Sequence, residues 1–218
     1  MITVACVWVE GNVPYPVDYV ERLRSMVYRN LKSRHAFVCL TDRPLCLPHG
    51  IGTIKIDRPV GMPGWWSKIE LYNPAHELLR GRVMYLDLDV VVMRSLAEIA
   101  KFDAPFALVP DAGTFKGRNG LKVVKRYNTS VMVWDERADL ARLHRLWNPN
   151  AARRLWGDQD FVGETLPSEA TMPLEWFPRV SEIDARPEML GEARVVLCKK
   201  PKNEEAARTR EWVKENWI

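Results

Sequence analysis

Two carboxylates separated by one residue stand inside the most apolar stretch of the chain. Asp87 and Asp89 interrupt residues 83–93, which otherwise consist of aliphatic residues, two methionines and one tyrosine. Because side chains alternate along a strand, a strand here places both carboxylates on one face, with Cα atoms about 7 Å apart. Ionising two such groups in an apolar setting is costly unless a cation lies between them. The pair therefore predicts a site for Mg²⁺ or Mn²⁺, which favour carboxylate oxygens.

The same pair has a simpler interpretation, in which both acids lie past the end of the strand and are solvated. The apolar residues 90–92 that follow favour the buried pair. One enzyme class with such a strand is the haloacid-dehalogenase-type phosphatase, in which Asp87 would be the nucleophile, and residues 157–160 are similar to its later acidic motif. In that class, however, the strand is normally the first of the domain, and here several elements precede it.

The segments around the pair alternate between strand and helix patterns. Residues 67–80 predict a helix, with Ser67 as its N-cap and Glu70 in the capping-box position. Residues 111–126 predict a loop rich in glycine and basic residues. Further strands are predicted at 2–9, 36–40, 51–56, 83–93, 106–109 and 130–134, and further helices at 17–32, 136–147 and 203–217. This alternation predicts one α/β domain over residues 1–218, with parallel strand pairs.

Composition excludes several classes of protein. The chain has 218 residues, of which 47% are hydrophobic and 28% charged, so it is neither a disordered chain nor a membrane bundle. No run approaches the roughly 18 apolar residues of a membrane-spanning helix, and residues 1–9 suit a first strand better than a signal peptide. The cysteines at 6, 39, 46 and 198 form no CxxC pair, so we expect free thiols and a cytoplasmic setting.

Several motifs share one order with a known family. Residues 64–71 read GWWSKIEL, 85–89 YLDLD, 127–132 YNTSVM and 157–161 GDQDF. This ordered set resembles the retaining GT-A glycosyltransferases of family 8 over most of the chain. The resemblance implies a single GT-A domain, a Rossmann-like nucleotide-diphospho-sugar transferase fold whose mostly parallel central sheet is flanked by helices. It also implies hexosyl transfer with retention from a nucleotide-diphosphate sugar, with a UDP-sugar the favoured donor.

The resemblance assigns a donor site on Asp87, Leu88 and Asp89. The two carboxylates would hold a Mn²⁺ or Mg²⁺ ion that bridges the two phosphates of the donor. Lys68 would add positive charge beside these phosphates, although its sequence context also fits a solvated helix lysine. Trp8 and Val9 would line the pocket of the nucleotide base, although Trp8 also fits a core position.

Three further residues are assigned to catalysis by the resemblance. Asp158 and Gln159 match the positions nearest the anomeric carbon. Asp158 would orient the sugar hydroxyls, and Gln159 would stabilise the anomeric centre without attacking it. Asn128 would contact the donor sugar or the acceptor. Two alternatives remain from the residues themselves: Asp158 also fits a helix N-cap, and Asn128 a turn at the entry of a strand.

The C-terminal segment departs from the family pattern. The family carries a metal-binding histidine and a phosphate-binding lysine in an HxGxxKP-like segment, and residues 195–202 here read VVLCKKPK. The best register places Cys198 at the position of the family's histidine, and Lys200 and Lys202 near the position of its lysine. Cys198 would then be a third metal ligand, or water would take that place. A thiolate is a softer ligand than imidazole and suits Mn²⁺ less well.

The acceptor is not identified by the sequence. Lys116, Arg118, Lys122, Lys125 and Arg126 gather in the predicted loop, and together with the lysines near the C-terminus they predict a positive rim. Such a rim suits a phosphorylated, lipid-linked or nucleic-acid acceptor. A non-catalytic nucleic-acid-binding module is the remaining alternative, but the aromatic residues lie mostly in apolar runs and give it little support.

Overall fold

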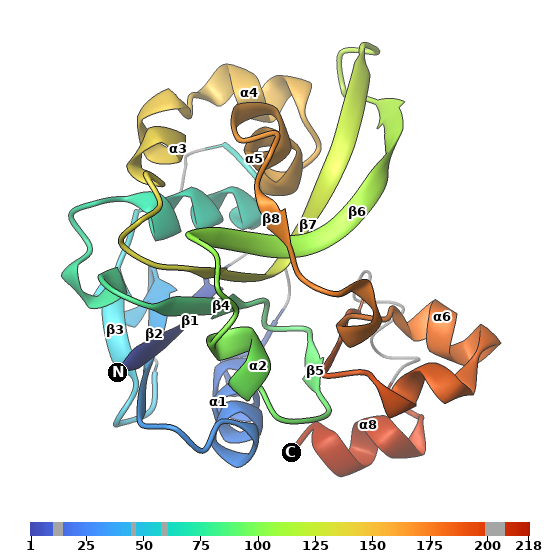
Figure 1. Cartoon of the computed structure of the whole chain (residues 1–218). Helices are drawn as coiled ribbons and strands as arrows, with labels where there is room; N and C mark the ends of the chain where they lie inside the picture. Colours follow the sequence, from blue (N-terminus) through green and yellow to red (C-terminus); the bar gives the residue numbers. More distant parts are fainter. Residues whose placement is uncertain (11–14, 45–46, 58–60, 199–207) are drawn as a thin grey trace.

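A computed structural model describes residues 1–10, 15–44, 47–57, 61–198 and 208–218. Its central feature is a seven-stranded sheet with the order β3-β2-β1-β4-β7-β6-β8 (Figure 1). The strands of this sheet are β1 (Ile2–Trp8), β2 (His35–Thr41), β3 (Gly52–Lys55), β4 (Val83–Leu86), β6 (Phe106–Lys116), β7 (Lys122–Trp134) and β8 (Ala170–Thr171). Strands β5 (Val91–Val92) and β9 (Val195–Val196) form a separate antiparallel pair.

Most strand pairs of the main sheet are parallel, as predicted. β1 pairs in parallel with both β2 and β4, β2 with β3, and β6 with β8, whereas β7 is antiparallel to β4 and to β6. The chain proceeds outward from β1 to β3 and then returns to place β4 on the other side of β1. The strand order therefore reverses between β1 and β4, and ligands of α/β sheets bind at the carboxyl ends of strands beside such a point.

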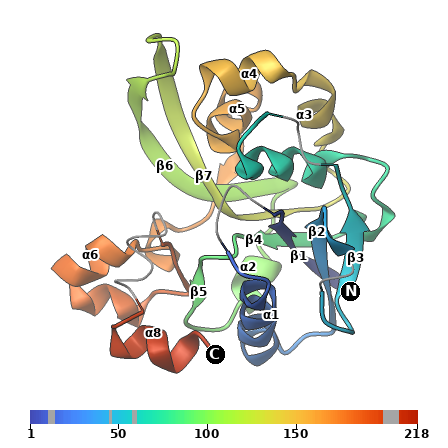
Figure 2. The ribbon, with the colours of Figure 1, turned by 180° about the vertical axis from the view of Figure 1, so that it is seen from behind.

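Helices cover both faces of this sheet (Figures 1 and 2). The α-helices are α1 (Asp18–Asn30), α2 (Ala97–Ala100), α3 (Ala141–Leu146), α4 (Pro149–Arg154), α5 (Asp158–Thr165), α6 (Val180–Ala185) and α8 (Glu211–Asn216). The 3₁₀ segments are η2 (Gly64–Tyr72), η3 (Glu77–Leu79), η4 (Leu174–Trp176) and η5 (Pro187–Gly191). No helix in the described ranges is long and apolar enough to span a bilayer.

The buried side chains form two core layers, one on each face. The α1 layer contains the apolar sides of α1, α2, α6 and α8, and the η2 layer contains those of η2, α3, α4 and α5. Strand side chains alternate between the layers: Val4 and Cys6 enter the α1 layer, and Ala5 between them enters the η2 layer. Cys6, Cys39 and Cys198 are free thiols, and Cys46 lies outside the described residues.

The predicted strand over residues 83–93 is wrong beyond Leu86. The backbone N–H of Asp87 donates to the Ser130 carbonyl, after which residues 88–89 form a turn. The apolar residues that continue the run belong to β5, which leaves the main sheet to pair with β9. Their hydrophobic character reflects burial in the α1 layer, not continuation of β4.

The predicted helix over 67–80 is also wrong in type and start. The chain instead forms the 3₁₀ segment η2, which begins at Gly64 directly after Pro63. Ser67 therefore lies inside the segment, where its Oγ is buried and finds no hydrogen-bond partner among the described residues. The predicted helix at 136–147 is shorter, as α3, and the one at 203–217 is described only from residue 208 on.

The predicted loop over 111–126 is a β-hairpin. Strands β6 and β7 continue through it and connect at residues 117–121, and the hairpin extends beyond the rest of the sheet (Figure 1). Its tip rests on α4, because the N–H of Arg118 donates to the Arg154 carbonyl at 2.9 Å. A Cβ at Gly117 would lie 2.8 Å from the same carbonyl oxygen, so this close approach requires glycine.

Candidate active site

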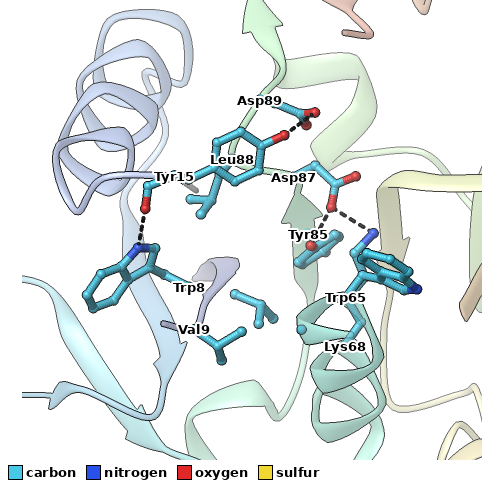
Figure 3. Close-up of a pocket in the computed structure, with 11 residues that line it drawn as sticks. Trp8, Val9, Tyr15, Trp65, Lys68, Tyr85, Asp87, Leu88 and Asp89 are labelled. Atoms are coloured by element: carbon cyan, nitrogen blue, oxygen red, sulfur yellow. Dashed lines mark hydrogen bonds and ion pairs between the residues drawn. The ribbon is translucent and has the colours of Figure 1, made fainter. Parts of the chain in front are cut away.

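A pocket of about 190 Å³ opens at the reversal point between β1 and β4. Strand β1 contributes Trp8 and the adjoining Val9 to its wall, and the turn after β4 contributes residues 87–89. Trp65 and Lys68 of η2 close it on the side of the η2 layer (Figure 3). The structure thus brings six of the predicted donor-site residues together: Trp8, Val9, Lys68, Asp87, Leu88 and Asp89.

The two carboxylates of this pocket are held by different partners. Oδ1 of Asp87 accepts a hydrogen bond of 2.6 Å from the Tyr85 hydroxyl and lies 2.7 Å from Nζ of Lys68. Oδ2 of Asp89 accepts one of 2.9 Å from the Tyr15 hydroxyl (Figure 3). The prediction that both acids lie within a strand is therefore wrong, because they follow its end. They are not simply solvated either, since only 20% of the Asp87 side chain is exposed.

Lys68 is a buried cation between two acids. Its Nζ lies 2.7 Å from Asp87 and 3.7 Å from Oδ2 of Asp158, and 5.3 Å from the centre of the Tyr85 ring. Burial alone would lower the pKa of Lys68, but the charges of Asp158 and Asp87 outweigh it and raise the pKa. The alternative of a solvated helix lysine is wrong, and Lys68 ties the turn after β4 to α5.

Asp158 begins α5 as its first helical residue. Its Oδ2 accepts a hydrogen bond of 2.6 Å from the Thr129 hydroxyl of β7. The N-cap is Gly157, whose N–H donates to Asp160, so the alternative role of Asp158 as N-cap is wrong. Burial raises the pKa of the Asp158 carboxyl, and the charge of Lys68 opposes this rise.

None of the three predicted catalytic residues, Asp158, Gln159 and Asn128, lines the pocket itself. Gln159 is half-buried at the second position of α5. Asn128 lies inside β7, not at the entry of a strand, and its Oδ1 accepts from the Ser130 N–H at 2.7 Å. Trp8 is only 9% exposed and packs in the α1 layer, and it also lines the pocket.

The residues present fit a hard divalent cation as a two-carboxylate site. None of the described side chains donates to Oδ2 of Asp87, which leaves this oxygen available to a metal. Within the described ranges, no three His, Cys, Asp or Glu side chains gather closely enough to hold an ion. Cys198 is half-buried against the α1 layer, and the predicted lysines Lys200 and Lys202 lie outside the described residues.

Sequence reasoning missed three residues that organise this site. Tyr85 lies two positions before Asp87, so the alternation of a strand could have indicated that it faces the same way. Thr129 stands in the YNTSVM segment but contacts Asp158 only through the pairing of distant elements. Tyr15 lies in a proline-flanked segment that carries no signal for a partner 74 positions away.

No protein-family model and no curated protein sequence matches the chain. Three solved structures with a similar fold are structures of glycosyltransferases. The apo structure of the bifunctional glycosyltransferase WbbM has a TM-score of 0.62 at 13% identity, over 98% of this chain and 50% of that one. This chain therefore spans half the length of the WbbM chain.

Two structures of LgtC are similar over more of their own length. Galactosyltransferase LgtC with donor and acceptor sugar analogues has a TM-score of 0.62 at 12% identity, with 98% of this chain and 99% of that one covered. An active-site mutant of LgtC has a TM-score of 0.64 at 12% identity, with 91% and 88% covered. The fold is thus that of the GT-A glycosyltransferases, and the resemblance predicted from the motifs is confirmed at the level of fold.

Proposed function

We propose that this chain is a metal-dependent glycosyltransferase that transfers a sugar from a nucleotide-diphosphate sugar to an acceptor. The observation that carries the proposal is the position of Asp87 and Asp89 in one turn, at the reversal point of a GT-A sheet, beside the buried pair of Lys68 and Asp158. A UDP-sugar is the favoured donor. A phosphorylated, lipid-linked or nucleic-acid acceptor would suit the basic residues of the β6–β7 hairpin.

Asp87 and Asp89 would hold the metal ion. Mn²⁺ or Mg²⁺, when bound, supplies a Lewis acid that offsets charge on the departing diphosphate. Tyr85 and Lys68 orient Asp87 through one oxygen, so the other oxygen would be available to the ion, and Tyr15 orients Asp89. Lys200 and Lys202 as phosphate-binding residues remain part of the proposal from the sequence resemblance. Water would take the place of Cys198, which does not gather with the two carboxylates in the described structure.

The sugar would lie between this turn and the start of α5. Asp158, fixed by Thr129, would orient the sugar hydroxyls, and the neutral amide of Gln159 would stabilise the anomeric centre without attacking it. The amide nitrogen of Asn128 remains to donate to the donor sugar or the acceptor, because its oxygen is already engaged. Retention through attack from the face of the leaving group follows from the same resemblance.

A hydrolysis and thermal-shift screen of UDP-, GDP- and CDP-sugars, with and without Mn²⁺, tests this proposal. We expect one nucleotide sugar to bind in a Mn²⁺-dependent manner, and Asp87→Asn and Asp89→Asn each to abolish that dependence. Asp103→Asn is the matched control, because that side chain is 89% exposed and does not line the pocket. The proposal fails if no nucleotide sugar binds or if both variants behave as the parent. Turnover of a simple phosphate ester through Asp87 would instead support the phosphatase.

A further inference from the structure

A second cavity lies at the opposite end of the sheet from the candidate active site. It has a volume of about 620 Å³ and is formed by the second half of α1, the segment leading into β2 and the start of β3. Because β1, β2 and β3 are parallel, this cavity lies at their amino ends, whereas the candidate active site lies at the carboxyl ends of β1 and β4. Its volume falls within the range of roughly 300–1,000 Å³ that is typical of small-molecule sites.

The charge of this cavity has a single sign. Arg24, Lys32, Arg34 and His35 line it, and none of the described lining residues is acidic. Nor does any carboxylate in the described part of the chain form an ion pair with Arg24, Lys32 or Arg34. Three permanent positive charges around one concave surface create a potential that attracts an anion.

Two other arginines on the same helix, by contrast, have partners among the described residues. Arg22 forms an ion pair of 3.1 Å with Asp18, and Arg29 donates to the backbone carbonyl of Asn216 at 2.6 Å. Arg29 is also the basic residue in the last turn of α1, so it complements the helix dipole there. Arg24 lies earlier in the helix, and its charge is not explained by the helix end.

The cavity also positions its cations and offers an apolar wall. A Cβ at Gly50, where φ is +84°, would lie 3.1 Å from Nη2 of Arg24, so the glycine leaves room for the guanidinium. Tyr28 and Leu78, which also line the cavity, are 76% and 50% exposed. An aromatic ring and an aliphatic side chain therefore stand beside the three cations.

We propose that this cavity binds an organic phosphate. Arg24 and Arg34 present planar guanidinium groups that match two phosphate oxygens at once, and Lys32 adds a third charge. The carbon skeleton of the ligand lies against Tyr28 and Leu78. Soluble phosphomonoesters and phospholipid headgroups share this chemistry. The inference does not depend on the proposed glycosyl transfer, because the two sites have no residue in common.

Calorimetric titration with phenyl phosphate, which carries both a phosphate and an aromatic ring, tests the site. The titration is run with EDTA so that no metal ion recruits phosphate to the candidate active site. We expect the double variant Arg24→Gln/Arg34→Gln to bind at least about tenfold more weakly than the parent, since it loses two charge-assisted contacts. Arg142→Gln on α3 removes one arginine charge away from the cavity and should bind as the parent does.

A second arm distinguishes the source of the phosphate. Sedimentation with phosphatidylcholine vesicles, with and without phosphatidic acid, presents the same group as a lipid headgroup. Binding of either probe that the double variant loses supports the proposal and identifies the source. Failure of both probes to bind, or equal binding by the parent and the double variant, overturns it. Arg34→Glu, at an exposed position, provides the same comparison if the double variant does not fold.

Discussion

The Tyr15 hydroxyl donates a hydrogen bond of 2.9 Å to Oδ2 of Asp89 across 74 positions of sequence. Tyr15 is itself fixed, because Trp8 donates from Nε1 to its carbonyl at 2.9 Å. Its ring lies 4.9 Å from that of Tyr19, which meets Trp217 edge-on at 5.2 Å. Three aromatic rings in contact, those of Trp217, Tyr19 and Tyr15, therefore connect the end of α8 with one carboxylate of the candidate active site.

Tyr15→Phe removes the hydroxyl and keeps the ring. We expect Mn²⁺ affinity to fall about tenfold, because residues that orient a metal ligand commonly have effects of this size. Titration followed by electron paramagnetic resonance measures the free ion. Tyr28→Phe, which alters an exposed tyrosine, is the control. Unchanged Mn²⁺ affinity in Tyr15→Phe would contradict the role given to this hydrogen bond.

Lys68→Met removes the buried cation between Asp87 and Asp158. We expect the free energy of unfolding at neutral pH to fall by about 3–5 kcal/mol, because a buried charge loses its partner. Denaturant titration measures this change, with Lys101→Met at an exposed position as the control. Adding Asp158→Asn to Lys68→Met should recover part of the loss. A double variant less stable than Lys68→Met would show that Asp158 is stabilised by other groups.

Asp135 gives a pH-dependent prediction. Hydrogen bonds from Arg137, and the charges of Arg137 and Arg82, lower the pKa of its carboxyl below the ordinary value of 3.8. Ionisation is therefore favoured in the folded state, so the stabilisation is complete well above pH 3.8 and is lost as the pH falls through the folded pKa.

Asp135→Asn should accordingly destabilise the chain by about 1.5–3 kcal/mol at neutral pH, the range for hydrogen bonds to charged groups. Its difference from the parent should shrink as the pH is lowered past 3.8. Thermal unfolding over a pH series measures both quantities. Asp139→Asn, where the side chain is 68% exposed, should change stability little at any pH. A difference that does not vary with pH would refute the linkage.

Gly117→Ala tests how the hairpin tip is docked. Its Cβ would meet the Arg154 carbonyl at 2.8 Å, so the tip must move away from α4. We expect a cost of about 1–3 kcal/mol, as for other overpacked positions. Hydrogen exchange should quicken at the Arg118 amide, which donates to that carbonyl. Gly113→Ala in the same hairpin meets nothing within 4 Å and should leave exchange unchanged.

Most strands of the main sheet could be predicted because their burial leaves a local pattern. Residues 2–9 and 36–40 predict β1 and β2 within one or two residues, since both faces of these strands are buried and their composition is apolar. The carboxylate pair was likewise visible, because two acids are conspicuous in an apolar run.

The remaining features depend on partners that are remote in sequence. The break after Leu86 arises because β5 pairs with β9, more than a hundred residues later, and an apolar run does not reveal which sheet it joins. The hairpin was missed because residues 111–126 are rich in charged residues and glycine, a composition typical of a loop. The hydrogen bond between Tyr15 and Asp89 could not be predicted either, because only the tertiary structure brings these two residues together.

The two carboxylates of the candidate active site are anchored on opposite sides of the sheet. Asp87 is held by Tyr85 and Lys68, which belong to the η2 side, and Asp89 by Tyr15, which packs on the α1 layer. The distance between the two carboxylates therefore depends on how the two core layers pack against each other. A core substitution that shifts one layer by a fraction of an ångström would change the distance between the two acids, even where it is too mild to unfold the chain.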